Sequence, residues 1–191
     1  MTARTHDLAA LTLLVAATVF TQPAALSLAT VLLALLANQI GGIVPDIDQP
    51  TAPLWRNLPI GRFFGKLVGG GLGGHRFMTH SLVGLALFGA LARAILGWLT
   101  PLLHHADTGY IWWAFMLGIV SHLLMDSLTK EGVPWLLPIP HKFGFPPLRA
   151  LRITTGTVSE TFLALPVIGI ALWLLIANNY GYLIHLLQGI R

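Results

Sequence analysis

The sequence predicts an all-α fold: an integral membrane bundle of about five helices, with a polar site at one membrane face. Hydrophobic residues make up 55% of the 191 residues and charged residues only 9%, whereas roughly 25% of an average globular domain is charged. Mean hydropathy is +0.75. A few strongly polar clusters separate apolar runs that approach the ~20 residues of a membrane span. We expect one membrane-embedded domain over residues 1–191.

Composition also excludes several classes of site and partner. The chain has no cysteine, so disulfides and thiolate-bound metals are excluded. The net charge is +4, but the basic residues lie in polar connections, where they can meet anionic lipid head groups. We therefore expect membrane lipids, and no nucleic acid, as partners. No small-residue cleavage site accompanies the first apolar run, so we expect a retained membrane segment rather than a signal peptide.

The first two apolar runs predict a pair of helices. Residues 8–20 are continuously apolar, and residues 5–7 must be added for the run to approach the length of a span. Pro23 suits the first turn of the second helix, because proline needs no hydrogen-bond donor there. We expect that helix to continue to about Val44 and to end at Pro45.

A long polar connection follows, over residues 49–74. It mixes basic residues with leucine, isoleucine, valine and phenylalanine, which indicates an amphipathic segment lying at the membrane interface. The glycine-rich stretch 69–74 is expected to be a flexible hinge. It lacks the flanking strand and the lysine of a phosphate-binding loop, so phosphate binding there is disfavoured.

Three further helices are expected over residues 79–99, 110–128 and 159–180. The connection over residues 129–158 contains five prolines, which argues against a long regular helix within it. An apolar tail, residues 181–191, completes the chain. Antiparallel packing of the five helices would bring four polar clusters, at residues 6–7, 45–48, 75–81 and 121–126, to one membrane face, and would leave His104, His105 and Asp107 on the other.

The basic residues orient that face. Nine of the 11 lysines and arginines lie on the side of the polar clusters, and the positive-inside rule therefore places that side in the cytoplasm. These nine residues are Arg4, Arg56, Arg62, Lys66, Arg76, Lys130, Lys142, Arg149 and Arg152.

The strongest indication of a chemical site is His122 with Asp126. In a helix these residues are one turn apart and project from the same face, where an imidazole and a carboxylate can grip one metal ion. Their neighbours, among them Ile119 and Leu123, are apolar. Either polar group alone would be costly inside a membrane, so an ordinary helix-end role is the weaker interpretation.

Other candidate ligands lie near predicted helix ends on the same face. Asp46 and Asp48 follow a helix C-terminus, where a carboxylate opposes the helix dipole, so capping does not explain them. His80 gains nothing from its expected place in a first helical turn, whereas Thr79 or Ser81 suits an N-cap, with Thr79 favoured. The full set of predicted metal ligands is His6, Asp46, Asp48, His75, His80, His122 and Asp126.

Imidazoles and carboxylates without thiolates suit zinc, and also manganese or iron. Several carboxylates favour more than one ion, so we expect one to three. Three residues are predicted to act on a substrate. Arg76 is expected either to contact an anion or, equally, to lie at the surface and meet lipid. Asp48 is expected to accept a proton. Glu160 is expected to be a metal ligand or general base or, equally, to cap the N-terminus of its helix.

These residues form motifs that resemble the signature of the YdjM-like family, which consists of bacterial inner-membrane proteins described as metal-dependent hydrolases. The resemblance implies location in the bacterial inner membrane. Gln49 and Phe77 stand where the family often has histidine and glycine. The matching motifs are Pro45-Asp46-Ile47-Asp48, His75-Arg76-x-x-Thr79-His80-Ser81 and Ser121-His122-x-x-x-Asp126-x-x-Thr129-x-x-Gly132.

The helix pair is also similar to that of the zinc-dependent phospholipase C and P1 nuclease group. That resemblance implies an all-helical zinc site that hydrolyses phosphoesters, with His122 and Asp126 as the helix pair and His6 as an N-terminal ligand. We therefore expect a phosphoesterase that acts on a lipid or lipid-linked head group. The alternative is a membrane protein that binds or transports a metal without hydrolysis. The oligomeric state is left open.

Overall fold

The computed structural model describes residues 1–71, 76–139 and 141–188, and confirms the predicted all-α membrane bundle. Five of its helical segments are long and apolar enough to cross a membrane. Within the described ranges the β structure is limited to two isolated bridges in the connection after the fourth segment. The five segments are Ala3–Thr21, Leu28–Asp48, Leu82–Leu99, Thr108–Ser127 and Glu160–Asn178.

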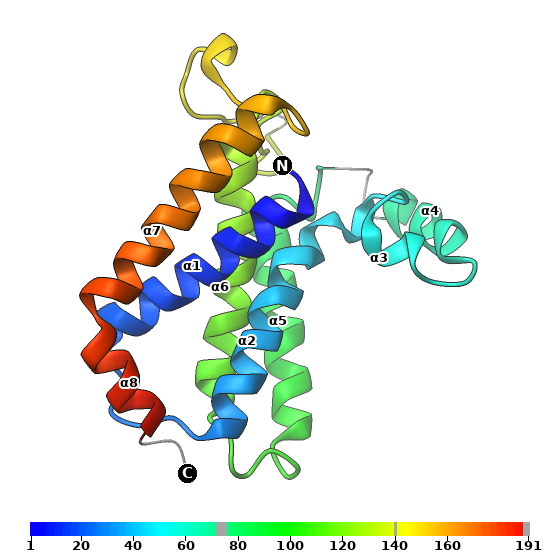
Figure 1. Cartoon of the computed structure of the whole chain (residues 1–191). Helices are drawn as coiled ribbons and strands as arrows, with labels where there is room; N and C mark the ends of the chain where they lie inside the picture. The colour runs from blue at the N-terminus through cyan, green and yellow to red at the C-terminus, as the bar shows by residue number, and fades with distance from the viewer. Residues whose placement is uncertain (72–75, 140, 189–191) are drawn as a thin grey trace.

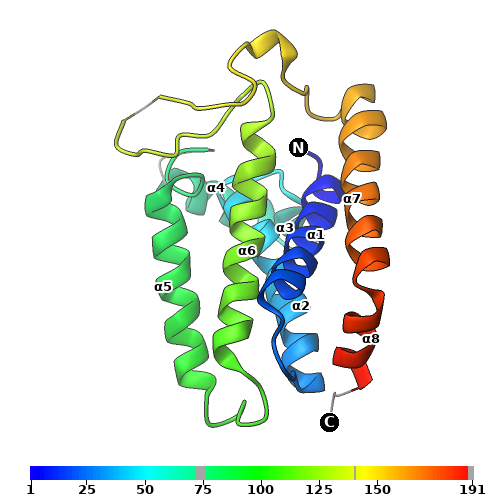
Figure 2. The same cartoon turned by 90° about the vertical axis from the view of Figure 1, so that its left-hand side faces the viewer.

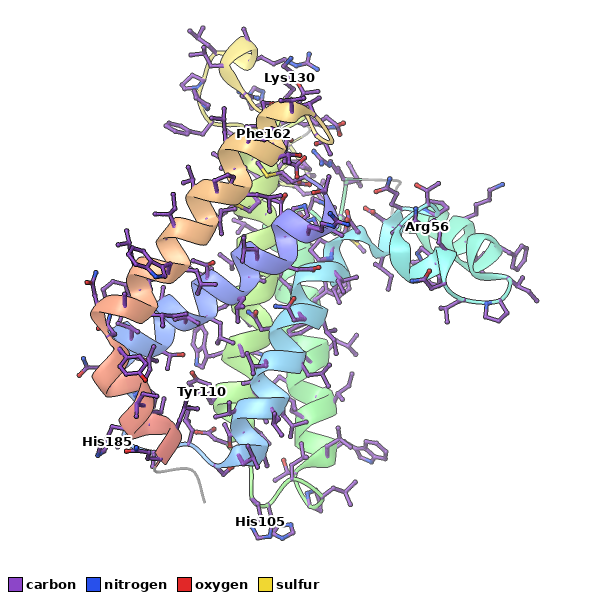
Figure 3. The ribbon with its side chains drawn as sticks, in the orientation of Figure 1. Arg56, His105, Tyr110, Lys130, Phe162 and His185 are labelled. Atoms are coloured by element: carbon purple, nitrogen blue, oxygen red, sulfur yellow. The ribbon has the colours of Figure 1, made fainter. Side chains whose placement is uncertain are left out.

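The helices alternate in direction, so the polar connections gather at one end of the bundle (Figures 1 and 2). We call this the site end. It holds the start of α1 (Ala3–Thr21), the end of α2 (Leu28–Ile43) and the end of α6 (Thr108–Ser127). Lys130 and Arg56 lie towards this end, whereas His105 and His185 lie at the other, which we call the opposite end (Figure 3).

The boundaries of the first two helices differ from the prediction. α1 begins at Ala3, slightly earlier than the expected start at residues 5–7, so His6 and Asp7 lie inside its first turns. α2 begins at Leu28 and not near Pro23, because the Ser27 hydroxyl accepts a hydrogen bond from Thr30 N at 3.1 Å and caps the helix there. α2 ends at Ile43, where the Pro45-containing 3-10 helix η1 (Val44–Asp48) takes over, as proline favours.

Close contact between α2 and α6 fixes the centre of the bundle. A Cβ on Gly41 would lie 2.1 Å from Phe115 O, and one on Gly118 would lie 2.1 Å from Asn38 O. Only glycine permits this approach, which is a common device between membrane helices. The buried Asn38 side chain donates from Nδ2 to Ala114 O at 3.0 Å and so joins the same two helices.

The connection after η1 forms two short helices, α3 (Pro53–Arg56) and α4 (Gly61–Gly71), which project sideways from the site end (Figure 1). The flexible hinge was therefore wrong for residues 69–71, which are helical, and residues 72–74 lie outside the described ranges. A Cβ on Gly69 would lie 2.4 Å from Asp48 O, so glycine lets α4 pack against η1. Exposed Phe63 and Leu67 give this arm apolar surface, and its place at the membrane interface stays a prediction.

The third and fifth spans begin later than expected, and the fourth begins earlier. α5 (Leu82–Leu99) begins after Ser81, which accepts from Gly84 N at 3.1 Å, so Ser81 and not Thr79 is its N-cap. His80 therefore precedes the helix. The fifth span opens with the π-helical turn η3 (Glu160–Ala164) and continues as α7 (Leu165–Asn178).

Two segments flank that fifth span. The proline-rich connection before it contains, in its described part, a single short 3-10 helix, η2 (Arg149–Leu151). The predicted apolar tail after it forms a further helix, α8 (Tyr180–Gln188), at the opposite end of the bundle.

Candidate metal centre

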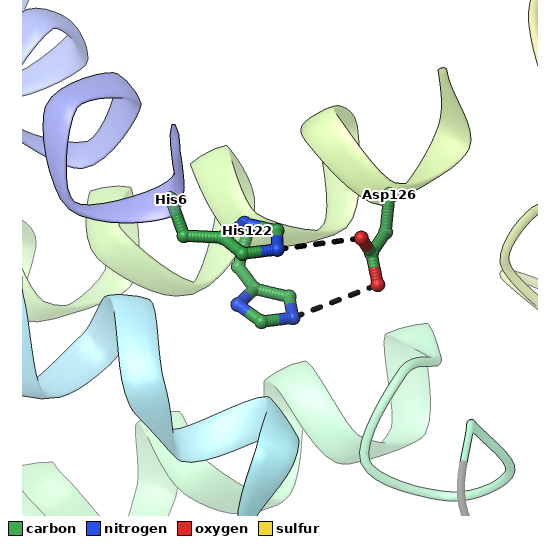
Figure 4. Close-up of side chains that lie close together, drawn as sticks. All are labelled: His6, His122 and Asp126. Atoms are coloured by element: carbon green, nitrogen blue, oxygen red, sulfur yellow. Dashed lines mark ion pairs between the residues drawn. The ribbon is translucent and has the colours of Figure 1, made fainter. Parts of the chain in front are cut away.

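The site is built on the last two turns of α6. His122 and Asp126 are each 1% exposed and face the same side of the helix (Figure 4). The His122 Nδ1–H donates to Gly42 O at 2.6 Å. A carbonyl can only accept, so this bond places the ring proton on Nδ1 and leaves the Nε2 lone pair directed at the site. The close approach of α2 to α6 thus selects the histidine tautomer.

α1 adds a second imidazole. The His6 ring stacks on His122 with centroids 3.8 Å apart and an interplanar angle of 6°. His6 Nε2 lies 3.3 Å from Asp126 Oδ1 (Figure 4). His6 is 3% exposed, so three helical segments bury a cluster that combines imidazole nitrogens and carboxylate oxygens.

Four ligand atoms from three parts of the chain surround one point. His80 Nε2 lies 3.7 Å from Asp46 Oδ1 and 3.5 Å from Asp126 Oδ2. His122 Nε2 lies 3.6 Å from Asp46 Oδ1 and 3.7 Å from Asp126 Oδ2. Zn²⁺ bonds of about 2.0–2.2 Å in tetrahedral geometry separate ligand atoms by about 3.3–3.6 Å. The four nitrogen–oxygen separations are close to this range, so these atoms could share one zinc ion.

The unpaired atoms of the cluster support the same conclusion. Within the described ranges, buried His122 Nε2 and His6 Nδ1 have no hydrogen-bond partner. A buried polar atom without a partner costs free energy, and a cation would satisfy His122 Nε2. The residues also form two triads that could hold a metal, His6–His122–Asp126 and Asp46–His80–His122. Both triads need the one available nitrogen of His122.

Asp46 and Asp48 take different places. Asp46 Oδ1 faces the ligand nitrogens, whereas Asp48 Oδ2 lies behind His80, 3.8 Å from its Nδ1. Asp48 Oδ2 accepts from Thr79 Oγ1 at 2.5 Å and from Arg76 N at 3.0 Å, and Thr79 Oγ1 also lies 2.9 Å from His80 Nδ1. A carboxylate that holds the far side of a ligating imidazole orients the ring.

Arg76 is buried, so its alternative placement as a surface arginine was wrong. Its side chain is 7% exposed, and Nη2 lies 2.7 Å from Asp126 Oδ2. Nη1 reaches Glu131 Oε2 at 3.3 Å and donates to Thr129 Oγ1 at 3.3 Å. The amino group of Met1 also contacts Asp126, at Oδ1. Arg76 therefore holds Asp126 in place, in addition to any contact with a substrate anion.

Glu160 serves the start of α1. Its Oε1 accepts from Thr2 N at 2.6 Å, Thr2 Oγ1 at 2.8 Å and Thr5 Oγ1 at 2.5 Å. Oε2 accepts from Gly156 N at 2.7 Å. Both oxygens are therefore occupied at the start of α1 and at Gly156, whereas the cap that the sequence left open was at the helix of Glu160 itself. These bonds also fix the part of α1 that carries His6.

One predicted ligand lies outside the described ranges, and two residues that serve the site were not predicted. His75 lies outside the described ranges. Thr79 and Gly42 were not predicted to serve the site, yet they hold the two ligand imidazoles. The signal for Thr79 is its place beside His80 in a motif that already contains Arg76. The signal for Gly42 is absent from the sequence, because the carbonyl of any residue can accept a hydrogen bond.

A cavity of about 350 Å³ opens beside the cluster. It lies between the start of α1, the end of α2 and the arm, and two of the clustered residues, His6 and Asp46, are among its walls. Among Asp46, His80, His122 and Asp126, the most accessible side chain is that of Asp46, which is 26% exposed. The cluster is thus buried on most sides and reachable on one.

A model of the YdjM inner membrane protein family matches residues 1–189. Inner membrane protein YdjM of Escherichia coli (strain K12) is 35% identical over 141 residues, covering 69% of this chain and 61% of the relative, and the Shigella flexneri protein of that name gives the same values. The uncharacterized protein YvsG of Bacillus subtilis (strain 168) is 29% identical over 124 residues, covering 65% of this chain and 66% of the relative.

The chain spans about three fifths of the length of the YdjM relatives that it matches. No solved structure matches the chain. The family model covers nearly every residue and includes all the motifs from which the site is built. The chain therefore belongs to the YdjM inner membrane protein family.

Proposed function

We propose that this protein is a membrane-bound, metal-dependent hydrolase, and that it cleaves a phosphoester in a lipid or lipid-linked head group. One observation carries the proposal. In the cluster of His80, His122, Asp46 and Asp126, the four pairs that join a ligand nitrogen to a ligand oxygen are separated by 3.5–3.7 Å, close to the spacing around one tetrahedral ion. A catalytic zinc site holds the ion with three protein ligands and leaves the fourth position to water. We propose that His80, His122 and Asp126 would be the three ligands, and that Asp46, which is 26% exposed and lines the cavity, would yield its position to water.

Zinc is the metal that this donor set and spacing favour, and bound zinc supplies a Lewis acid and a water of lowered pKa. The chain's own residues supply the rest. His122 is fixed by Gly42, His80 by Thr79 and Asp48, and Asp126 by Arg76. The more exposed Asp46 faces the cavity, and Arg76 lies where a guanidinium can offset negative charge that develops nearby.

The position of the cluster favours a lipid head group as the substrate. The site lies where three membrane-spanning segments end or begin, at the level expected for head groups. An ion-transport site would be expected near the bilayer midplane. We therefore favour hydrolysis over metal transport.

We also propose that the site end faces the cytoplasm, because most basic residues lie on that side. The chain has no native cysteine, so single-cysteine labelling is direct. A cysteine at Gln49 should react with a membrane-impermeant maleimide only after cells are opened, and one at His105 should react in intact cells. Labelling of the Gln49 position from the periplasm would refute the orientation.

The proposed activity is tested by two measurements on the detergent-purified protein. The first is metal content per chain, and the second is hydrolysis of a panel of phospholipids and lipid diphosphates. We expect about one zinc ion per chain and release of a phosphate-containing head group or of phosphate. A variant with His122→Ala should lose both. Bound metal without hydrolysis of any member of the panel would favour the alternative, a metal-binding membrane protein.

A further inference from the structure

We propose that the cavity beside the metal centre recognises a zwitterionic phospholipid head group that bears an ammonium, and that Asp7 is the residue that selects it. The inference rests on the proposed function, since it places the phosphate at the metal centre. It names the substrate class that the cavity favours, namely phosphoethanolamine-type head groups over glycerol-type ones.

The walls of the cavity combine two kinds of surface. Apolar and small residues form one part, and the polar part includes three acidic or imidazole side chains and one amide. The lining residues are Ala3, His6, Asp7, Gly42, Ile43, Asp46, Asn57 and Leu58. None of these lining residues is lysine or arginine, so a second anionic group on the substrate would have no cationic side chain of the wall to meet.

Asp7 is the wall residue with an uncommitted charge. Its carboxylate forms no hydrogen bond or ion pair with any residue in the described ranges, although Gln39 Nε2 donates to its backbone oxygen at 3.4 Å. It follows His6 directly, and the His6 ring is buried with an unpaired Nδ1. Asp7 and His6 line the same cavity, as does the metal ligand Asp46, so a molecule in the cavity can meet both Asp7 and the cluster.

The arrangement fits a short, two-ended ligand. The cavity of about 350 Å³ is large enough for a head group. A phosphate at the metal centre would leave the next few atoms of the head group beside Asp7. An ammonium there would donate a charge-assisted hydrogen bond to the carboxylate. A glycerol hydroxyl would gain a weaker neutral one, and an additional phosphate would be repelled by Asp7 and Asp46.

The test measures binding separately from catalysis. Zinc-loaded protein in detergent is titrated with sn-glycero-3-phosphoethanolamine and with sn-glycero-3-phosphoglycerol by calorimetry. We expect the ethanolamine compound to bind about tenfold more tightly to the wild type. Asp7→Asn keeps the size of the side chain and removes its charge. This variant should lose most of the preference, bind the glycerol compound as before, and retain its zinc.

Asp107→Asn is the matched control, because Asp107 caps α6 at the opposite end and asparagine also caps. This variant should bind both compounds as the wild type does. Equal binding of the two compounds by the wild type, binding of neither, or an equal loss of both in Asp7→Asn would overturn the inference. Loss of zinc in Asp7→Asn would instead make Asp7 a ligand and would also overturn it.

The proposed function fails separately from this inference. If the protein hydrolyses phospholipids without head-group preference, the proposed hydrolase activity stands and the proposed role of Asp7 is refuted. If binding shows a head-group preference that depends on Asp7 but no phospholipid is hydrolysed, the recognition site stands and the proposed hydrolase activity is refuted.

Discussion

The two ends of α6 bury polar groups in opposite ways. At the opposite end, where α6 begins, Tyr110 OH hydrogen bonds with Thr18 Oγ1 at 2.7 Å, and Thr18 Oγ1 donates to Leu14 O at 2.8 Å. The Asp107 carboxylate accepts from Tyr110 N at 2.9 Å and caps the helix. These polar groups satisfy one another, and apolar cavities of about 340 and 510 Å³ surround them.

At the site end, where α6 finishes, some buried polar atoms are paired, as Asp126 is with Arg76, but others have no partner among the described residues. His122 Nε2 has no hydrogen-bond partner in the described ranges, although Asp46 and Asp126 oxygens lie within 3.6–3.7 Å of it. Their separations are too long for hydrogen bonds and suit a shared ion. The number of buried polar groups therefore does not identify a site. What distinguishes the site end is that lone pairs point at a common centre.

We expect Asp126→Asn to have the largest effect on metal binding. A small effect would contradict the difference between the two ends of α6. The change keeps shape but removes a charge that faces the metal, so metal affinity should fall by more than 100-fold, while the protein remains inserted. Bound metal per chain, measured beside Asp107→Asn as the control at the opposite end, tests this. Equal metal content in the wild type and Asp126→Asn would remove Asp126 from the site.

Thr79→Val should have the next largest effect. The substitution removes the hydroxyl that bonds Asp48 Oδ2 and His80 Nδ1, so the His80 ring loses its support. Metal affinity should fall by about 10–100-fold. Thr18→Val makes the same chemical change at the opposite end and should leave metal affinity unchanged. A similar loss in both variants would show that the effect is general destabilisation.

Gly118→Ala tests whether the α2–α6 contact between the two ends carries the geometry of the site. The added Cβ would lie 2.1 Å from Asn38 O and must separate the helices, at a cost of about 1–3 kcal/mol in stability. The melting temperature in detergent should fall, and metal content should fall with it because Gly42 O would move from His122. Gly97→Ala, where a Cβ meets nothing within 4 Å, should change neither; a matching fall there would contradict the packing argument.

Tyr110→Phe should have the smallest effect. It removes one hydroxyl and its 2.7 Å bond to Thr18, which should cost about 1 kcal/mol or less, since Thr18 keeps its bond to Leu14 O. Thermal unfolding and metal content are measured together. A loss of metal in Tyr110→Phe would show that the two ends of α6 are coupled, and would contradict the view that polar groups at the opposite end do not serve the metal centre.

Several features were predictable from the sequence because they depend on polarity along the chain. Apolar runs between polar clusters predicted five spans, and their alternation predicted that His6, Asp46, His80 and His122 share one end. The i, i+4 spacing of His122 and Asp126 predicted their common face. Such properties follow from helical periodicity and from the cost of burying charge in lipid, and neither depends on which helices touch.

Tertiary structure alone decided which atoms serve the site. The sequence could not distinguish Asp46, which faces the ligand nitrogens, from Asp48, which supports His80, because their order depends on the 3-10 turn at Pro45. It could not predict that Arg76 is buried against Asp126. Nor could it assign the proton of His122, which is fixed by a carbonyl that the close α2–α6 contact brings within 2.6 Å. These outcomes depend on distances of a few tenths of an ångström between segments far apart in the chain, and only packing sets such distances.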